Sequence, residues 1–253
     1  MLKVGTFSAC SNVTGLVVDT DEISALMHKH DAVVFWDYAG GAPYLKIDMN
    51  SPHNPAAFKD AVFCSPHKFA GGPGTPGLLI AKKTLFTNTV PHAGGGGTVV
   101  YVTRHKHTYT SNVEAREEGG TPAIIESIRA GLVFQLKEVI GCDMIHKREE
   151  HLAQKGIESL SKNSNIMLLG SKVLPRIPIL SFCVKHPASK KLVHHNFIAL
   201  LLSDLFGIQA RGGCACAGPY AQDLLGIADE VANGMYDLIQ LKFLLWLAKQ
   251  SQN

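Results

Sequence analysis

The stretch CSPHKFAGGPGTPG, residues 64–77, places Lys68 between a short apolar run and a series of glycines and prolines. The apolar run AVFC at 61–64 predicts a strand inside a sheet. Lysines are usually solvated surface charges, but this one stands in a loop whose glycines let the backbone approach a ligand closely. A primary amine becomes a useful nucleophile when its surroundings lower its pKa, and its best-known product is a Schiff base with a carbonyl compound.

Further strands are predicted on both sides of this loop. Residues 3–8 favour a short strand, and the apolar runs at 32–36 and 77–81 are typical of strands buried on both faces. Between the first two strands, residues 19–30 predict a helix capped by Asp19 or Thr20. Strand, helix and strand in this order indicate an α/β layer with a parallel component. Residues 38–60 predict a loop.

The second half of the chain is dominated by helices. The clearest is predicted at 121–141, with Thr121 as N-cap, Pro122 at the first helical position and Gly141 at the end. The other predicted elements are helices at 142–160, 194–207 and 228–249 and a strand at 176–184. We therefore expect a large domain at residues 1–130 and a smaller α+β domain at 131–253.

Composition narrows the classes of function. The chain has 253 residues, of which 46% are hydrophobic and 18% charged, and a net charge of +3. Its basic residues form no block, so we expect no nucleic-acid partner. Because no apolar run approaches the roughly 20 residues of a membrane span, we expect no membrane association. Six cysteines are too few for a dense disulfide framework in a chain this long, which favours a reducing compartment, the cytoplasm or an organellar matrix.

Three polar residues follow predicted strands: Asn12, Asp37 and Lys68. Taken singly, they are ordinary choices for a turn, a cap and a solvated loop, but ligands of open α/β sheets bind beyond the carboxyl ends of strands. Ser65 and His67, beside Lys68, are donors suited to phosphate oxygens. An aspartate facing a pyridinium nitrogen, together with a Schiff-base lysine, is the arrangement that pyridoxal 5'-phosphate (PLP) requires.

The sequence resembles the class V aminotransferases of PLP fold type I, which include cysteine desulfurases, selenocysteine lyases and isopenicillin N epimerase-like proteins. The resemblance implies an incomplete large domain with a mostly parallel sheet and a small α+β C-terminal domain. The matching segments occur in family order over nearly the whole chain: SNVTG (11–15), FWDYA (35–39), SPHKFAGGPGTPGLL (65–79), EEGGTP (117–122) and RGGCACAG (211–218).

The resemblance assigns a role to each cofactor residue. Lys68 would form the Schiff base with PLP, and Asp37 would pair with the pyridine nitrogen. Asn12 would contact the 3-hydroxyl oxygen of the ring. Ser65 and His67 would hold the phosphate.

The resemblance also implies a partner and a reactive thiol. Thr121 would reach the phosphate of PLP in a partner subunit, which implies a homodimer. Cys216 falls where cysteine desulfurases with an RxGxxC motif carry their persulfide cysteine, and Arg211 is the arginine of that motif. Cys214 and Cys216 have an alternative interpretation as two small buried residues of a tight loop.

Parts of the family pattern are missing. The family has a glutamine or histidine three residues after the aspartate, where this chain has Gly40. The phosphate-binding glycine loop and the ring-stacking residue of the family lie upstream of a segment like SNVTG. No arginine follows Arg211 to bind a substrate carboxylate. We therefore expect the middle and C-terminal portion of a longer enzyme.

Three functions remain open at this point. The first is a PLP-dependent transferase or lyase that acts on an amino acid through a Lys68 Schiff base. The second is a truncated, catalytically inactive remnant, or a partner subunit of a full-length homologue. The third is a metal site, which we do not expect, because the C-x-C of Cys214 and Cys216 has no second Cys/His pair at metal-site spacing.

Overall fold

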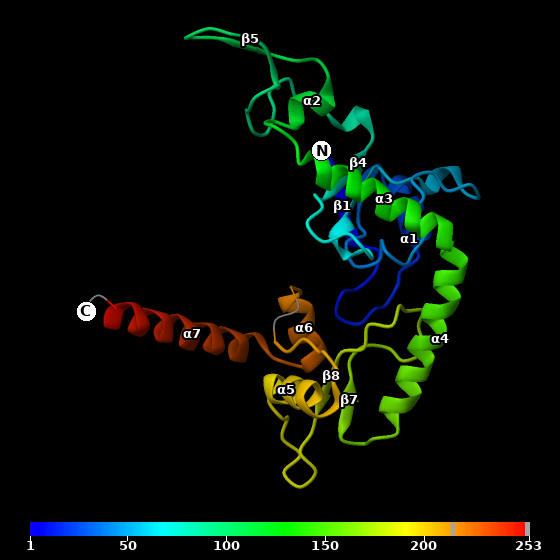
Figure 1. Ribbon diagram of the computed structural model, residues 1–253, viewed down its shortest axis with the longest axis vertical. Helices are drawn as coiled ribbons and strands as arrows, with labels where there is room; N and C mark the ends of the chain where they lie inside the picture. The colour runs from blue at the N-terminus through cyan, green and yellow to red at the C-terminus, as the bar shows by residue number, and fades with distance from the viewer. Residues whose placement is uncertain (214–215, 251–253) are drawn as a thin grey trace. The chain divides into compact units, whose positions relative to one another are not determined.

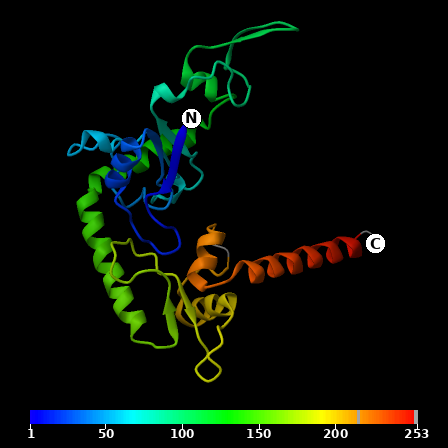
Figure 2. The same ribbon diagram turned by 180° about the vertical axis from the view of Figure 1, so that it is seen from behind.

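The computed structural model describes residues 1–213 and 216–250, and the chain forms two compact units (Figures 1 and 2). Unit 1 comprises residues 1–11, 16–152 and 174–178, and unit 2 comprises residues 12–15, 153–173 and 179–253. The domain division at residue 130 stays a prediction.

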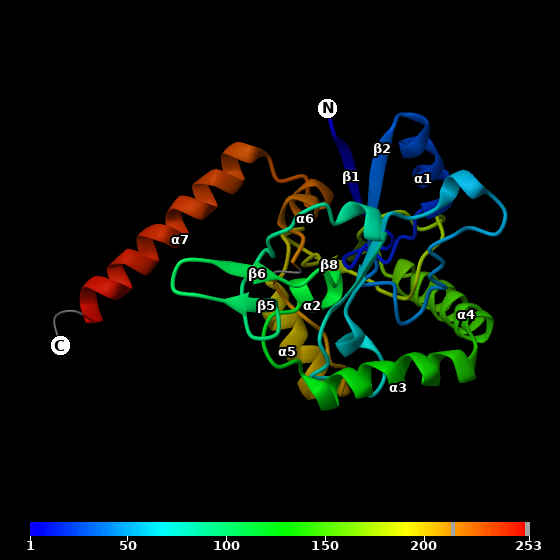
Figure 3. The same ribbon diagram turned by 90° about the horizontal axis from the view of Figure 1, so that it is seen from above.

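Unit 1 is built around a four-stranded sheet in the order β1-β2-β3-β4 (Figure 3). Its strands are β1 (Lys3–Ser8), β2 (Ala32–Asp37), β3 (Ala61–Cys64) and β4 (Leu78–Ala81). The first three strands are parallel, and β4 is antiparallel to β3. The predicted mixed α/β layer with a mostly parallel sheet is therefore confirmed.

Helix α1 (Thr20–Lys29) connects the first two parallel strands. Asp19 is the cap, because its carboxylate accepts hydrogen bonds from the backbone N–H groups of Asp21 and Glu22 at 3.0 and 2.9 Å. On the inner face, the indole N–H of Trp36 donates to the Ser24 hydroxyl at 2.9 Å. This bond satisfies the one polar atom of a fully buried tryptophan.

The core of unit 1 lies on one face of β2. Ala32, Val34 and Trp36 are buried, whereas the alternating residues Val33, Phe35 and Asp37 are only half-buried. The expectation that this strand is buried on both faces is therefore wrong for one face. The same holds for β4, where Leu79 and Ile80 are 61% and 46% exposed, because β4 has only one neighbouring strand. The buried cluster also contains Ala9, Tyr38, Ala42, Val62, Cys64, Phe69 and Val133.

The remainder of unit 1 contains elements that the sequence did not indicate. A hairpin of β5 (Val99–Val102) and β6 (His107–Tyr109) and a short helix, α2 (Val113–Glu117), follow β4. Short 3₁₀ turns occupy Pro55–Ala57, Pro66–Lys68 and Lys83–Leu85. The hairpin has a register irregularity between Val99 and Tyr101 and mostly exposed side chains, so it lacks a clear alternation of buried and exposed positions.

Helices α3 (Ile124–Ile140) and α4 (Cys142–Ser161) follow, separated by Gly141. The predicted end of α3 at Gly141 is confirmed, and the residue has a positive φ of 89°. The predicted start is wrong, because the N-cap is Ala123 rather than Thr121 and makes no side-chain capping bond. The segment before the helix pairs with the tetraglycine instead, since the Gly120 N–H donates to the Gly96 carbonyl at 2.9 Å.

Unit 2 holds a two-stranded antiparallel sheet of β7 (Ile166–Leu168) and β8 (Phe182–Val184). The predicted strand at 176–184 is correct only over its last three residues, because Pro175 and Pro178 interrupt strand pairing before them. The helices of this unit are α5 (His195–Phe206), α6 (Gly218–Leu225) and α7 (Asp229–Gln250). Among the described residues, no helix is long and apolar enough to cross a membrane.

Candidate active site

The carboxyl ends of the three parallel strands meet at one edge of the unit 1 sheet. Ser8 of β1 is in register with Asp37 of β2, and Asp37 with Phe63 of β3. Backbone bonds continue this register beyond the strands, since the Tyr38 N–H donates to the Phe63 carbonyl at 2.9 Å. The edge therefore brings Asp37 next to the start of the segment that carries Lys68.

Asp37 is half-buried and held in a defined orientation. Its carboxylate accepts a hydrogen bond from the Ala39 N–H at 2.6 Å, which fixes the turn that follows β2. Its charge reaches the end of the next strand, where burial, together with the Asp37 charge, raises the pKa of the Cys64 thiol. An oriented carboxylate at a sheet edge can accept a hydrogen bond from a protonated ring nitrogen.

Ser65 to Lys68 form a single tight turn. Ser65 caps the 3₁₀ turn Pro66–Lys68, and the Lys68 N–H donates to the Ser65 carbonyl at 3.0 Å. The next residue, Phe69, is buried and packs on Phe134 of α3 with ring centroids 4.7 Å apart. Phe69 thus anchors the turn in the core while His67 and Lys68 are exposed.

The glycine-rich part of the loop folds back onto this turn. A Cβ atom at Gly72 would lie 2.0 Å from the Pro66 carbonyl oxygen, so only glycine fits there. The loop is also tied to α3, because the Arg129 guanidinium donates to the Pro73 carbonyl at 2.9 Å. The Thr75 hydroxyl donates to the Gly72 carbonyl at 2.8 Å. These contacts fix the backbone on both sides of Lys68.

Thr121 lies in unit 1, exposed, three residues before α3. The segment before it packs on the tetraglycine Gly94–Gly97, where a Cβ on Gly95 would lie 3.0 Å from the Gly119 backbone. Two glycine segments therefore approach each other closely beside the exposed threonine.

The other predicted site residues lie in unit 2. Asn12 is exposed in the short segment 12–15. Cys216 is exposed with a positive φ of 58°, and the Arg211 guanidinium lies 3.6 Å from its sulfur. This contact places a cation beside the thiol, as the RxGxxC resemblance implies. Cys214 lies outside the described residues.

The donor set of unit 1 fits PLP. One sheet edge supplies a carboxylate, Asp37, and the adjoining turn supplies a hydroxyl, an imidazole and an amine from Ser65, His67 and Lys68. Gly72 packs closely against the Pro66 carbonyl, so the backbone of this loop makes tight contacts. Gly40 supplies no side chain at this edge. Within the described residues, no group of three or more His, Cys, Asp or Glu side chains could hold a metal ion.

One arrangement of reactive side chains was not predicted from the sequence. A cavity in unit 1 is lined by Lys137 and Cys142, which belong to α3 and α4 and to none of the motifs above. The only sequence signal was the terminating Gly141, which predicts a sharp change of direction between these two residues.

Comparison with known proteins identifies the family of the chain. The family Aminotransferase class-V matches residues 2–229. A probable cysteine desulfurase of Halalkalibacterium halodurans is 31% identical over 217 residues, which cover 86% of this chain and 50% of that protein. The chain thus spans about half the length of the curated relatives it matches.

Solved structures show the same fold. The cysteine desulfurase CsdA of Escherichia coli superposes with a TM-score of 0.74 at 25% identity, covering 89% of this chain and 52% of that one. A C-DES mutant described with glycine covalently linked to its PLP cofactor superposes with a TM-score of 0.62 at 21% identity, covering 90% and 60%. The fold is therefore that of PLP fold type I, and the chain belongs to the class V aminotransferase family of PLP-dependent enzymes.

Proposed function

We propose that this chain carries the lysine-bearing site of a PLP-dependent transferase or lyase that acts on an amino acid. The observation that supports this most directly is the shared sheet edge, where Asp37 ends β2 and the Lys68 turn follows β3. When bound, PLP supplies an electron sink for negative charge at the substrate Cα.

Each residue has a distinct part in this proposal. Lys68 would hold the cofactor through Nζ and would carry protons as a general base. Asp37 keeps the pyridine nitrogen protonated, and Asn12 binds the 3-hydroxyl oxygen. Ser65 and His67 bind the phosphate.

Within this class, the desulfurase reaction has the best support. The relative from Halalkalibacterium halodurans is named a probable cysteine desulfurase, and Cys216 is an exposed thiol with the Arg211 guanidinium at 3.6 Å. A neighbouring cation stabilises a thiolate, which is the form that attacks sulfur. We propose that Cys216 accepts the sulfur atom of a cysteine substrate.

The proposal includes a homodimer in a reducing compartment. Thr121 is exposed and belongs to the EEGGTP segment, so it would bind the PLP phosphate of the partner subunit. Free thiols at all five described cysteines fit the cytoplasm.

The test is the visible absorption of the purified chain mixed with PLP. The wild type and Lys83→Ala, which removes a largely exposed lysine, are expected to show the band of a lysine-bound cofactor. Lys68→Ala is expected to lose it. Cys216→Ala is expected to retain the band but to release no sulfide from cysteine with a reductant. A wild type without the band would rule out cofactor attachment at Lys68.

A second candidate is a non-catalytic partner of a full-length homologue. One observation favours it: Gly40 and the stretch after Arg211 lack two family contacts. In that case Thr121 would complete a phosphate site in the homologue. Size-exclusion chromatography of a mixture should then give a heterodimer peak, and separate elution of the two proteins would reject this candidate.

A further inference from the structure

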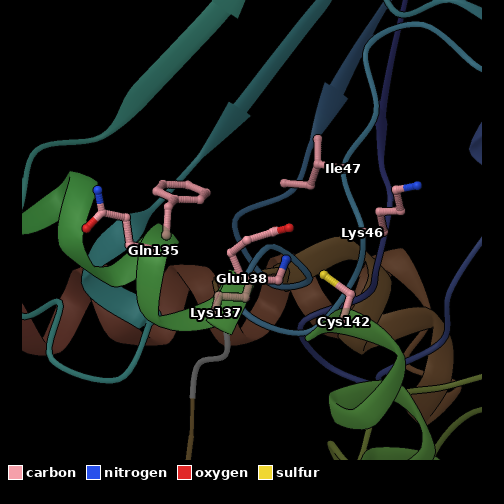
Figure 4. Close-up of a pocket in the computed structure, with 7 residues that line it drawn as sticks. Lys46, Ile47, Gln135, Lys137, Glu138 and Cys142 are labelled. Atoms are coloured by element: carbon pink, nitrogen blue, oxygen red, sulfur yellow. The ribbon is translucent and has the colours of Figure 1, made fainter. Parts of the chain in front are cut away.

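Unit 1 contains a cavity of about 410 Å3 whose lining combines reactive and apolar side chains (Figure 4). Lys137 and Cys142 point into it from the end of α3 and the start of α4. Ile47 and Phe134 contribute apolar surface. The remaining lining residues are Lys46, Gln135 and Glu138.

Lys137 is fixed in place beside this cavity. Its Nζ donates to the Ala42 carbonyl at 2.7 Å and to the Leu45 carbonyl. Burial lowers the pKa of Lys137, while the charge of Cys142 and its hydrogen bond oppose this effect. The amine is therefore half-buried, interacts with the thiol and is able to exchange a proton with it.

Cys142 is brought to Lys137 by the turn between the helices. The Gly141 N–H donates to the Lys137 carbonyl at 2.9 Å, and the Gly141 carbonyl accepts from the Ile145 N–H at 3.1 Å. Cys142 is consequently the first residue of α4, which has 20 residues.

The other described cysteines differ in their surroundings. Cys10 and Cys64 are buried, and burial raises the pKa of the Cys10 thiol to about 11. The Lys137 charge also acts on Cys64, but burial outweighs it and raises the pKa of the Cys64 thiol. Burial also raises the pKa of the Cys183 thiol. Cys183 and Cys142 are both half-buried. Cys183 is therefore a matched comparison for Cys142 within the same chain.

We propose that the Lys137–Cys142 pair is a thiol modification site for small oxidants of the hydroperoxide class. The Cys142 thiol gives its proton to the Lys137 amine, and the thiolate sulfur attacks one peroxide oxygen. An S–O bond forms as the O–O bond breaks, and the departing hydroxide or alkoxide takes the proton from Lys137 to leave as water or an alcohol. Sulfur loses two electrons and the peroxide gains them, so the product is a sulfenic acid.

The cavity suits a small reagent of this kind. About 410 Å3 lies near the lower end of the range of small-molecule sites. Lys46 and Glu138 also line the cavity, so one positive and one negative side chain accompany the Lys137–Cys142 pair. None of the cavity residues belongs to the proposed PLP site, so the reaction requires neither PLP nor Lys68.

The experiment exposes the full chain to hydrogen peroxide, traps sulfenic acid with dimedone, and quantifies the adduct at each cysteine by peptide mass spectrometry. Native Cys142 is expected to react at least about tenfold faster than Cys183, because Lys137 is placed to take the thiol proton and return it to the leaving group. The difference should disappear in denaturant. The Lys68→Ala variant should behave as the wild type, which separates this site from the proposed PLP function.

Two variants test the role of the lysine. Lys137→Met is expected to slow the reaction of Cys142 about tenfold, whereas Lys46→Met leaves the rate within about twofold of the wild type. Should Lys137→Met fail to fold, the comparison of Cys142 with Cys183 in the wild type still decides. Equal native rates at Cys142 and Cys183 would overturn the proposal, and so would a folded Lys137→Met variant with an unchanged Cys142 rate.

Discussion

Gly72 is the residue at which the backbone around Lys68 is most tightly constrained. A Cβ atom there would overlap the Pro66 carbonyl, which is a backbone atom of the turn that presents Lys68. A side chain at this position must therefore displace the turn itself. The arrangement couples the stability of unit 1 to the position of the proposed Schiff-base lysine.

For Gly72→Ala we predict a loss of unfolding free energy of about 1–3 kcal/mol, the usual cost of overpacking. Gly131→Ala is the matched control, because Gly131 lies inside α3 with nothing within 4 Å of an added Cβ. Alanine there should stabilise the helix by about 1 kcal/mol. Urea denaturation of both variants measures the effects, and an unchanged midpoint for Gly72→Ala would show that the turn adapts.

Lys59 and Asp21 form an ion pair in which the lysine is buried and the aspartate is partly exposed. Lys59 is 2% exposed, and its Nζ lies 2.9 Å from the Asp21 carboxylate. Burial raises the pKa of Asp21, but the Lys59 hydrogen bond and charge, together with the polar neighbours Ser51 and His53, outweigh it. The net pKa lies below the usual value.

A lowered pKa in the folded state stabilises the protein above the pKa of the unfolded chain, about 3.9 for Asp. This contribution is lost as the pH falls through the folded-state pKa. We predict that Asp21→Asn lowers the urea midpoint at about pH 6 and that the difference from wild type shrinks toward about pH 3. Glu22→Gln, in the same helical turn, should show little difference at either pH. A deficit for Asp21→Asn that is independent of pH would contradict the role of its charge.

At the scale of elements, α3 has apolar residues on two faces. Ala130 and Val133 are buried in unit 1. The other face carries an exposed row at intervals of four residues, which consists of Ile124, Ile128, Leu132, Leu136 and Ile140. A helix that is apolar all round is usually buried on all sides, and a large exposed apolar patch promotes association.

We predict that the double variant Ile128→Glu/Leu132→Lys weakens concentration-dependent self-association without lowering the urea midpoint. Both side chains are more than half exposed, so charge there removes no core contact. Val133→Asp is the contrasting variant on the buried face and should cost several kcal/mol of stability. Light scattering across a concentration series measures association, and unchanged scattering by the double variant would remove this face as its cause.

At the scale of the molecule, the two units differ in how much they bury. The main hydrophobic cluster, from Ala9 to Val133, lies entirely in unit 1. In unit 2, the described hydrophobic side chains that are buried are Val13, Ala153 and Leu169. Since buried apolar area is the main source of stability, we expect unit 2 to be the less stable of the two.

This difference predicts unfolding in more than one step. In a Trp246→Phe background, Trp36 is the only tryptophan and reports on unit 1, where it is fully buried. Its fluorescence should change at higher urea concentration than the circular dichroism of helices from both units. Coincident transitions would show that the chain unfolds as one cooperative body.

The sequence by itself determined the family and the α/β class, and it predicted which residues are offered to the cofactor. Motifs such as SPHKFAGGPGTPGLL are local, and local order along the chain was enough to propose Asp37 and Lys68 as cofactor residues. Continuous apolar runs such as 32–36 also identified strands correctly, because strand formation depends on neighbouring residues.

Only the tertiary structure decided which faces are buried and which distant residues meet. The exposure of β4 depends on its having a single neighbour in the sheet, and the need for glycine at position 72 depends on a carbonyl six residues earlier. The Lys137–Cys142 pair depends on the change of direction at Gly141 and on the loop carbonyls of Ala42 and Leu45. The bonds from Lys137 to Ala42 and Leu45 join segments far apart in the chain, and the other contacts depend on the backbone geometry of turns, so no local pattern of residue types encodes them.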